Sequence, residues 1–477
     1  MGNRGCLAVV SQPGCFLFRF SISLAKNPCF PGAWVRRCLL PDLMKIVFLT
    51  PGTGSYYCGA CMRDNALANA LIDAGHDASL LPMYLPLMLD DNSKGLGDDT
   101  PIFFGGINIY MQQKMSIFRR APIWLDKLLN RPGLLRSAAK RSHMTSARDH
   151  GEMCFEMLRL DSDDFKKELG KLYSWINDTG KPDVLVLSTA LQAGFAKEVK
   201  AQWPGMPVLC CFQGEDSFLD SLPDGYRDEC WKLMADKCRD TDRLVAPSRS
   251  YARMMEMRLS LDPGSIGVQR NGINLEGFVE PKRPDPPAIG YLARMCEVKG
   301  LRLLVDAFVH LRTVLGNENC QLKIAGAVTA GDVSLVEELK SKIANARLSD
   351  SVDWRLNISR DEKQSFLSEL SLFTVPVQYE EAFGLYVVEA MAASVPVCQP
   401  NHSAFPELVE ETGGGLCVSM ETAQSLAEAW QELLQSPERL AAMGDAGRAG
   451  AEKRFSMEAM KDSFMDVVES LVQGSAR

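Results

Sequence analysis

The sequence predicts an α/β protein with two doubly wound parallel sheets in tandem. A chain of 477 residues exceeds what one hydrophobic core usually organises, so two domains are expected. From Lys45 onward, short apolar runs rich in β-formers alternate with longer amphipathic stretches, which is typical of βα units around a parallel sheet. A proline-dense stretch, residues 280–287, divides this series into two. Because ligands bind beyond the carboxyl ends of such strands, we expect a site in the cleft between the domains.

The first expected domain covers residues 44–279 and the second covers residues 288–455. Residues 280–287 are the expected linker, because their prolines exclude a helix or a central strand. Residues 456–477 are expected to form a C-terminal helix. In the first domain, strands are expected at 46–49, 78–81, 184–187, 207–212 and 244–246, and helices at 62–74, 155–176, 191–201 and 248–259. In the second, strands are expected at 289–292, 322–325, 372–376, 395–398 and 416–418.

Residues 1–43 precede the first expected strand. The run that starts at Met44 looks like the beginning of a protein that opens with a buried strand. We therefore expect residues 1–43 to be a disordered leader or the product of a translation start assigned too far upstream. A degenerate secretion signal is the alternative, because a loose apolar run at 7–24 is followed by Arg36 and Arg37.

Composition excludes several classes of protein. The formal net charge of −8 argues against binding nucleic acid through global electrostatics. Fifteen cysteines at irregular spacing in a long chain favour reduced thiols and a cytoplasmic protein. No apolar run approaches the roughly 18 residues that a membrane span requires.

A basic insertion at residues 110–150 interrupts the βα rhythm. Residues 114–148 contain nine Lys and Arg against a single acid, Asp126, interleaved with large apolar side chains. Such a segment suits an anionic or lipid-linked acceptor, or peripheral association with the inner face of a membrane. A solvated helical pair that caps the cleft is the alternative.

The most informative segment lies between the third and fourth expected strands of the second domain. Glu381 and Glu389 are separated by seven residues there, and Phe383-Gly384-Leu385 stands where a loop turns into a helix. The start of a helix offers free backbone N–H groups and a positive dipole end, which suits a phosphate, and Gly384 allows close approach of the backbone. Glu389, further into the helix, suits vicinal hydroxyls of a sugar or ribose.

This segment resembles the Glu-seven-Glu signature of family 4 retaining glycosyltransferases. The resemblance covers about residues 44–475 and implies the GT-B fold, in which two Rossmann-like domains face a cleft and the last helix, here 457–472, crosses back to the first domain. It implies that Glu381 contacts the donor sugar and that Glu389 binds the ribose of a nucleoside diphosphate sugar.

A second match stands after the first strand of the second domain. The family places an Arg there and, five residues on, a Lys followed by Gly, which correspond to Arg294, Lys299 and Gly300. By resemblance, both cations grip the diphosphate and stabilise the leaving nucleotide. With the helix start at Phe383 they would supply the positive field, so no metal ion and no cofactor is expected.

The end of the first domain also resembles the family, at 245–248 and 268–278. Asn271-Gly272 in this region favours a tight turn with positive φ, and its expected role is structural.

The first domain conforms less well. A glycine-rich loop at 50–59 follows the first strand, and the family uses such a loop, here with Gly54, to face the donor phosphate and the acceptor. Its spacing does not fit Gly-x-Gly-x-x-Gly, which disfavours a dinucleotide dehydrogenase. Cys58 and Cys61 have metal-ligand spacing, but no second Cys or His pair follows, so no metal site is expected.

A departure from the family follows the fourth expected strand. Many members carry a His there, whereas this chain reads Gln213-Gly214-Glu215-Asp216. Gln213 is a candidate to bind a sugar hydroxyl, and Glu215 or Asp216 to orient the acceptor or take its proton.

The expected function is transfer of a hexose, with retention, from a nucleoside diphosphate sugar to a hydroxyl of a glycan or lipid-linked acceptor, in polysaccharide or glycolipid biosynthesis. A departing phosphate oxygen can accept the proton, so the reaction needs little from an enzymic base. Two alternatives stay open. One is a nucleotide-sugar epimerase on the same fold, which the two signatures disfavour. The other is a non-catalytic sugar-nucleotide-binding subunit, which the missing His motivates.

Overall fold

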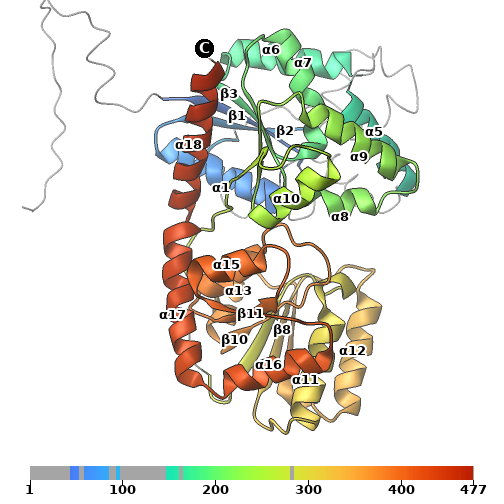
Figure 1. The fold of residues 1–477 in the computed structure, drawn as a ribbon, viewed down its shortest axis with the longest axis vertical. Helices are drawn as coiled ribbons and strands as arrows, with labels where there is room; N and C mark the ends of the chain where they lie inside the picture. Colours follow the sequence, from blue (N-terminus) through green and yellow to red (C-terminus); the bar gives the residue numbers. More distant parts are fainter. Residues whose placement is uncertain are drawn as a thin grey trace, which may run out of the picture. The chain divides into compact units, whose positions relative to one another are not determined.

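Six parallel strands form the first sheet, in the order β2-β1-β3-β4-β5-β6 (Figure 1). The computed structural model describes residues 43–52, 59–84, 87, 93–96, 147–160, 165–279 and 284–475. The strands of the first sheet are β1 (Lys45–Thr50), β2 (Asp77–Pro82), β3 (Val184–Leu187), β4 (Val208–Cys211), β5 (Arg243–Ala246) and β6 (Ile266–Val268).

The helices that accompany the first sheet, among the described residues, are α1 (Gly59–Asp73), α5 (Ala147–Arg159), α6 (Lys166–Thr179), η3 (Ala190–Gln192), α7 (Gly194–Gln202), α8 (Glu215–Asp220), α9 (Tyr226–Cys238) and α10 (Arg249–Arg258). The single helix expected at 155–176 is wrong, because α5 ends at Arg159 and α6 begins at Lys166. Leu160 follows α5 with a φ of 49°, a left-handed conformation that cannot continue a right-handed helix. We call the described part of residues 43–279 the first lobe.

Alternate residues of the central strands face two separate apolar layers. Val47 and Leu49 of β1 pack into a cluster with α5, α6, α7 and α9. Ile46 and Phe48 point the other way and pack with α1 and the last helix, α18 (Met457–Ser475). All four side chains are fully buried, as expected for a central strand covered on both faces.

The second sheet also has six parallel strands, in the order β12-β11-β10-β7-β8-β9. Its strands are β7 (Ala288–Leu292), β8 (Gln321–Gly326), β9 (Val352–Leu356), β10 (Leu372–Phe373), β11 (Val397–Pro400) and β12 (Gly415–Val418). The accompanying helices are η4 (Glu297–Lys299), α11 (Leu301–Thr313), α12 (Val333–Asn345), η5 (Ser349–Ser351), α13 (Arg360–Ser368), α14 (Leu385–Ala392), α15 (Phe405–Thr412), α16 (Ala423–Leu434) and α17 (Pro437–Arg454). We call residues 284–456 the second lobe.

The last helix belongs to the packing of the first lobe, as expected. Met460, Phe464 and Val468 of α18 are buried in the layer that α1 forms with β1. The rings of Phe464 and Phe48 stack with centroids 5.7 Å apart. In Figure 1, α17 and α18 follow one another as the red helices at the C-terminal end of the chain.

The turn expected at Asn271-Gly272 is absent, since neither residue has a positive φ in the described chain. Gly272 instead allows close packing against the start of α18. A Cβ atom at this position would lie 2.7 Å from the backbone oxygen of Ser456 and 2.8 Å from Cβ of Met460. Ile273 and Ser456 form an isolated parallel bridge beside it.

Each sheet has one point where the strand order reverses. In the first sheet this switch point lies between β1 and β3, and in the second it lies between β7 and β10. Helices on opposite faces diverge at such points and leave a crevice beyond the carboxyl ends of the two strands. The residues that follow these four strands are therefore the first place to search for a site.

Candidate functional site

Lys299 and Glu381 meet at the switch point of the second sheet. Lys299 ends η4, which follows β7, and Glu381 lies on the segment that follows β10. Gly300 makes the junction possible, because its φ is 74° and a Cβ atom there would stand 1.8 Å from the carbonyl oxygen of Pro376. Only glycine lets the start of α11 lie against that backbone.

The ammonium group of Lys299 forms an ion pair with Oε2 of Glu381 inside a box of two tyrosines. It lies 4.9 Å from the ring centroid of Tyr379 and 5.0 Å from that of Tyr386. Both tyrosine hydroxyls donate to the same oxygen of Glu381, at 3.1 Å and 2.9 Å. Three donors thus converge on Oε2. Burial, together with the charge of Glu381, holds the pKa of Tyr386 well above its usual value, so its hydroxyl keeps the proton that it donates.

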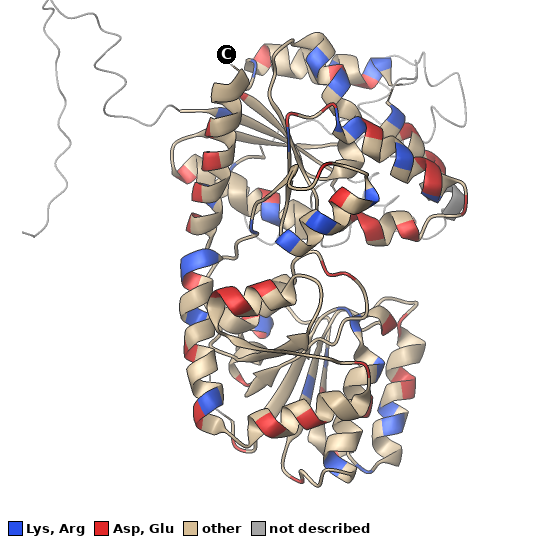
Figure 2. Ribbon diagram, viewed as in Figure 1, with Lys and Arg blue, Asp and Glu red and all other residues tan. Residues whose placement is uncertain are grey.

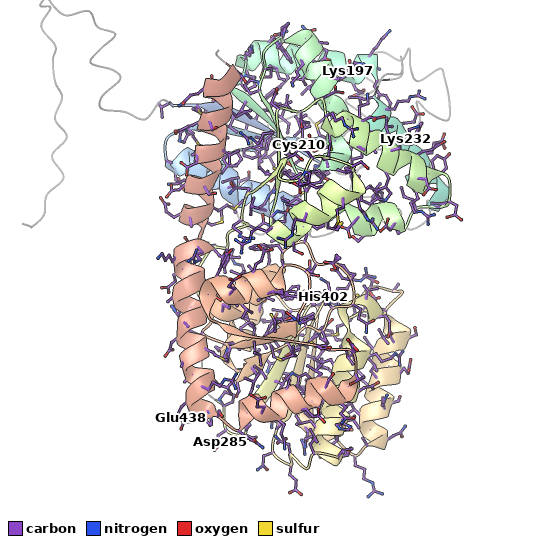
Figure 3. All side chains as sticks on the ribbon, viewed as in Figure 1. Lys197, Cys210, Lys232, Asp285, His402 and Glu438 are labelled. Carbon is purple, nitrogen blue, oxygen red and sulfur yellow. The ribbon has the colours of Figure 1, made fainter. Side chains whose placement is uncertain are left out.

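A neighbouring loop fixes the backbone of Glu381. Ser403 accepts a hydrogen bond from the backbone N–H of Glu381 at 3.0 Å, and its hydroxyl lies 2.8 Å from Nδ1 of His402. His402, labelled in Figure 3, stands on the loop between β11 and α15. This His is absent from the sequence-based candidates.

The helix start expected at Phe383-Gly384-Leu385 is confirmed. Gly384 has a φ of 84° and precedes α14, which begins at Leu385. Phe383 is buried, with its ring 5.8 Å from that of Phe455. Glu389 lies one turn into the helix and binds Nζ of Lys363, on α13, at 2.5 Å. Both glutamates of the signature are therefore paired with a lysine.

Two cavities adjoin α13. One, of about 260 Å³, is lined by Leu385 and Glu389 from the second lobe and by residues of α1 that include Arg63. The other, of about 350 Å³, lies beyond the ends of β7 and β8. Arg360 and Lys363 line both cavities, so the first turn of α13 separates them. A larger cavity of about 410 Å³ opens beside the residues that precede β7 and contains none of the predicted side chains.

Arg294 stands apart from Lys299 and Glu381. Its side chain is 55% exposed, and it donates to Asp332 from Nε at 2.9 Å and from Nη2 at 3.2 Å. Partial burial alone would raise the pKa of Asp332, but hydrogen bonds from Arg294 and Thr329 outweigh it and lower that pKa. In the described chain Arg294 is therefore held by the loop before α12.

The loop after β4 is held by Glu215. The residue is 2% exposed, and its two carboxylate oxygens accept hydrogen bonds from the hydroxyls of Thr189 and Tyr251 and from the backbone N–H groups of Ala190, Gln213 and Gly214. Such a carboxylate anchors a loop. Asp216 accepts from Tyr251 at 2.6 Å, and burial raises its pKa. Gln213 accepts a long hydrogen bond, 3.5 Å, from Asn271.

Gly54 and Cys58 lie outside the described residues, as does the basic insertion except for its last four positions, where α5 begins. Within the described ranges, no group of three or more His, Cys, Asp or Glu could hold a metal ion. In the same ranges, no helix combines the length and the apolar character that crossing a membrane demands.

Contacts between α10 and α15 join the two lobes, which lie in one compact unit. Glu407 of α15 accepts from the backbone N–H groups of Arg249 and Ser250, at 3.1 Å and 3.0 Å, and from Nη2 of Arg270 at 2.6 Å. Ser248 donates to the carbonyl of Ala382 at 2.7 Å. Figure 2 shows the acidic bands on α15 and the basic bands on α10.

Comparison with known proteins identifies the second lobe. Residues 274–450 match the model of a family described as Glycosyl transferases group 1. The match covers most of the second lobe. A Rhizobium meliloti protein, the lipopolysaccharide core biosynthesis mannosyltransferase LpsB, is 30% identical over 197 residues, which are 40% of this chain and 53% of that protein. The chain spans about half the length of the curated relatives it matches.

Solved structures match over most of this chain. Sucrose-phosphate synthase from Thermosynechococcus elongatus superposes with a TM-score of 0.66 at 17% identity and covers 90% of this chain and 100% of its own. HepE from Anabaena, solved with UDP and glucose, gives a TM-score of 0.59 at 15% identity, over 90% of this chain and 100% of its own. These likenesses show the GT-B fold that the sequence predicted.

Proposed function

We propose that this protein transfers a hexose from a nucleoside diphosphate sugar to an acceptor hydroxyl with retention of configuration, as a family 4 glycosyltransferase. The observation that carries the proposal is the pairing of Glu381 with Lys299 and of Glu389 with Lys363, within a segment that matches a glycosyltransferase family. The mannosyltransferase and the UDP and glucose complex among the similar proteins support this class of donor.

In the proposed reaction Lys299 exchanges its carboxylate partner for the diphosphate. The ion pair with Glu381 stores the ammonium group beside the first turn of α14, where free backbone N–H groups also favour a phosphate. Once Lys299 moves, the two tyrosine hydroxyls still stabilise the Glu381 carboxylate. Its other oxygen, Oε1, is then available to a sugar hydroxyl. Glu389 is proposed to bind the ribose, and Leu385 to line its pocket.

The remaining sequence-based candidates enter the proposal as follows. Arg294 reaches the diphosphate by exchanging Asp332 for a phosphate oxygen, a change that its 55% exposure allows. Lys299, Arg294 and the start of α14 supply positive charge to the leaving group, so we propose that the reaction requires no metal ion. A departing phosphate oxygen takes the acceptor's proton. Gln213 and Asp216 stay the candidates for binding the acceptor, and Glu215 holds their loop.

Nucleotide binding and transfer can be tested on the full chain. We expect one class among UDP, GDP and ADP sugars to raise the melting temperature, because a ligand that binds only the folded state stabilises it. Lys299→Met and Glu389→Ala should abolish this shift. Lys323→Met is the matched control, since Lys323 forms an equally buried ion pair with Glu369 away from both cavities.

Product analysis tests the finer statements. The anomeric configuration of the product, read by proton NMR, should be that of the donor, and a chelator should leave the rate unchanged. A folded wild-type chain that binds no nucleotide sugar would refute the proposed function. Inversion, or loss of activity with the chelator, would refute only the retaining or the metal-free part.

The acceptor and the location are proposed from the sequence. The basic, apolar segment at 114–148 favours a glycan or lipid-linked acceptor and peripheral binding at the cytoplasmic face of a membrane. Co-sedimentation with vesicles containing about 30% anionic lipid, compared with neutral vesicles, tests this. Equal recovery with both would contradict it.

A further inference from the structure

The switch point of the first sheet carries buried polar groups that the proposed reaction does not use. Thr50 is the last residue of β1 and Ser188 follows β3, and both are fully buried. Within the described ranges, Oγ1 of Thr50 and Oγ of Ser188 have no hydrogen-bond partner. On α1, Oδ2 of Asp64 and Oδ1 of Asn65 are also buried without a hydrogen-bond partner among the described residues. Buried polar atoms are nearly always satisfied by protein, water or ligand, so a polar occupant is expected nearby.

Arg63 connects this cluster to a cavity. Arg63 is 7% exposed, and its guanidinium donates from Nε to Oδ1 of Asp64 at 2.9 Å, with Nη2 bound to the same oxygen. Arg63 also lines the 260 Å³ cavity that Glu389 and Lys363 line from the second lobe. The guanidinium has a second partner in the first lobe, the thiol of Cys211 at the end of β4.

Burying a guanidinium raises the free energy of the folded protein unless an anion or hydrogen-bond acceptors pair with it. Moving an ion out of water carries a large free-energy cost, even after the protein relaxes around it. Asp64 is the charged partner of the Arg63 guanidinium among the described residues, and the thiol of Cys211 is only a weak acceptor. Such an arrangement at a cavity wall suits a second anion, because a guanidinium matches the oxygens of a phosphate.

The charged residues that line the cavity also favour an anion. Arg63, Arg360 and Lys363 line it against a single acid, Glu389. A phosphate group in the cavity would be attracted by these cations.

We propose that Arg63 binds a phosphate group of a ligand in this cavity, and that Asp64 positions its guanidinium. The proposal rests on the proposed function, since it adds a cation of the first lobe to the same site. The phosphate is either the diphosphate of the nucleotide sugar or a phosphate carried by the acceptor.

The test compares binding of phosphate-free and phosphate-bearing probes by titration calorimetry. Arg63→Met is combined with Asp64→Asn, so that no buried carboxylate is left unpaired. The probes are a nucleoside, its diphosphate, and glycerol 3-phosphate added to protein saturated with that diphosphate. We expect the double variant to bind the nucleoside normally and to lose about tenfold or more of its affinity for one phosphate probe. Lys200→Met, which breaks an ion pair elsewhere in the first lobe, should change neither.

The outcomes separate the two sources and the two proposals. Weaker binding of the nucleoside diphosphate assigns Arg63 to the donor, and weaker binding of glycerol 3-phosphate alone assigns it to the acceptor. Unchanged affinity for both, in a folded variant, overturns the subsite and leaves the proposed function intact. A folded wild-type chain that binds no nucleotide overturns both. Should the double variant not fold, Arg63→Lys takes its place, and unchanged affinity there overturns the subsite as well.

Discussion

Glu407 should be among the most costly single carboxylates to remove from this protein. The side chain is 9% exposed, and it reaches from α15 of the second lobe to the first turn of α10. There it accepts from the backbone N–H groups of Arg249 and Ser250 and from Arg270. Replacement by alanine removes all three hydrogen bonds together, and replacement by glutamine keeps one neutral acceptor.

The magnitude follows from these partners. A hydrogen bond to a charged group contributes about 1.5 to 3 kcal/mol when buried. The two N–H groups lie on a partly exposed turn where water can replace the carboxylate, so we take the lower limit for each. Arg270 keeps Glu411 and the carbonyl of Pro247 as acceptors, which reduces its loss. The sum for Glu407→Ala is about 3 kcal/mol, and that for Glu407→Gln about 1 to 2 kcal/mol.

Urea denaturation followed by circular dichroism measures both values, provided that the m-value stays constant. Glu411→Ala is the control, because Glu411 pairs with Arg249 and Arg270 but accepts from no backbone N–H of α10 in the described chain. Its expected loss is about 1 kcal/mol. A loss below about 0.5 kcal/mol for Glu407→Ala would refute the reasoning, since it would mean that water satisfies the start of α10 equally well.

Three further predictions concern stability, acid sensitivity and turnover. Gly300→Ala should lower the free energy of unfolding by about 3 kcal/mol or more, because its Cβ would stand 1.8 Å from a carbonyl oxygen. Gly316 has a similar φ but open space around it, so Gly316→Ala should cost only about 1 kcal/mol. Equal losses in thermal denaturation would contradict this. Burial alone would raise the pKa of Glu369, but hydrogen bonds from Arg355 and a neighbouring lysine lower it to about 2. The ionised carboxylate therefore stabilises the fold above about pH 4.3, and this stabilisation is lost as the pH falls toward 2. In Glu369→Gln, the free energy of unfolding should fall by about 2 kcal/mol less over this pH range than in the wild type, and an equal fall in both would count against the prediction. Tyr386→Phe removes one of the three donors to Glu381 and should slow sugar transfer about tenfold, with nucleotide affinity unchanged; full turnover would exclude a role for that hydroxyl.

The sequence predicted every central strand of both sheets, together with the edge strands β2 and β12. Val184–Leu187 is a continuous apolar run in the middle of its sheet, and its bounds were predicted without error. The two missed strands, β6 and β9, are edge strands. β6 has three residues, and Asp353 and Arg355 alternate with apolar residues in β9, so neither has the long apolar run of a central strand. The second domain's strand at 395–398 was placed two residues early, because Val395 is buried outside the ladder.

Tertiary partners limited what could be predicted of the site. The start of α14 and the signature glutamates follow from local pattern, but no spacing reveals that Lys363 pairs with Glu389 across two helices. Had β9 been recognised, the residues after its carboxyl end would have pointed to Lys363. Arg63 and Asp64 look like ordinary charges on a helix until the fold buries them.

The packing of α18 on the first lobe has a consequence for synthesis of the chain. The first sheet is complete at Val268, yet Met460, Phe464 and Val468, which cover one of its faces, are made about 190 residues later. At about 5 to 20 residues per second, that face waits roughly 10 to 40 seconds on the ribosome for its cover. The first lobe is therefore translated first but completed last, and its uncovered apolar face is the part of the nascent chain that a chaperone would meet.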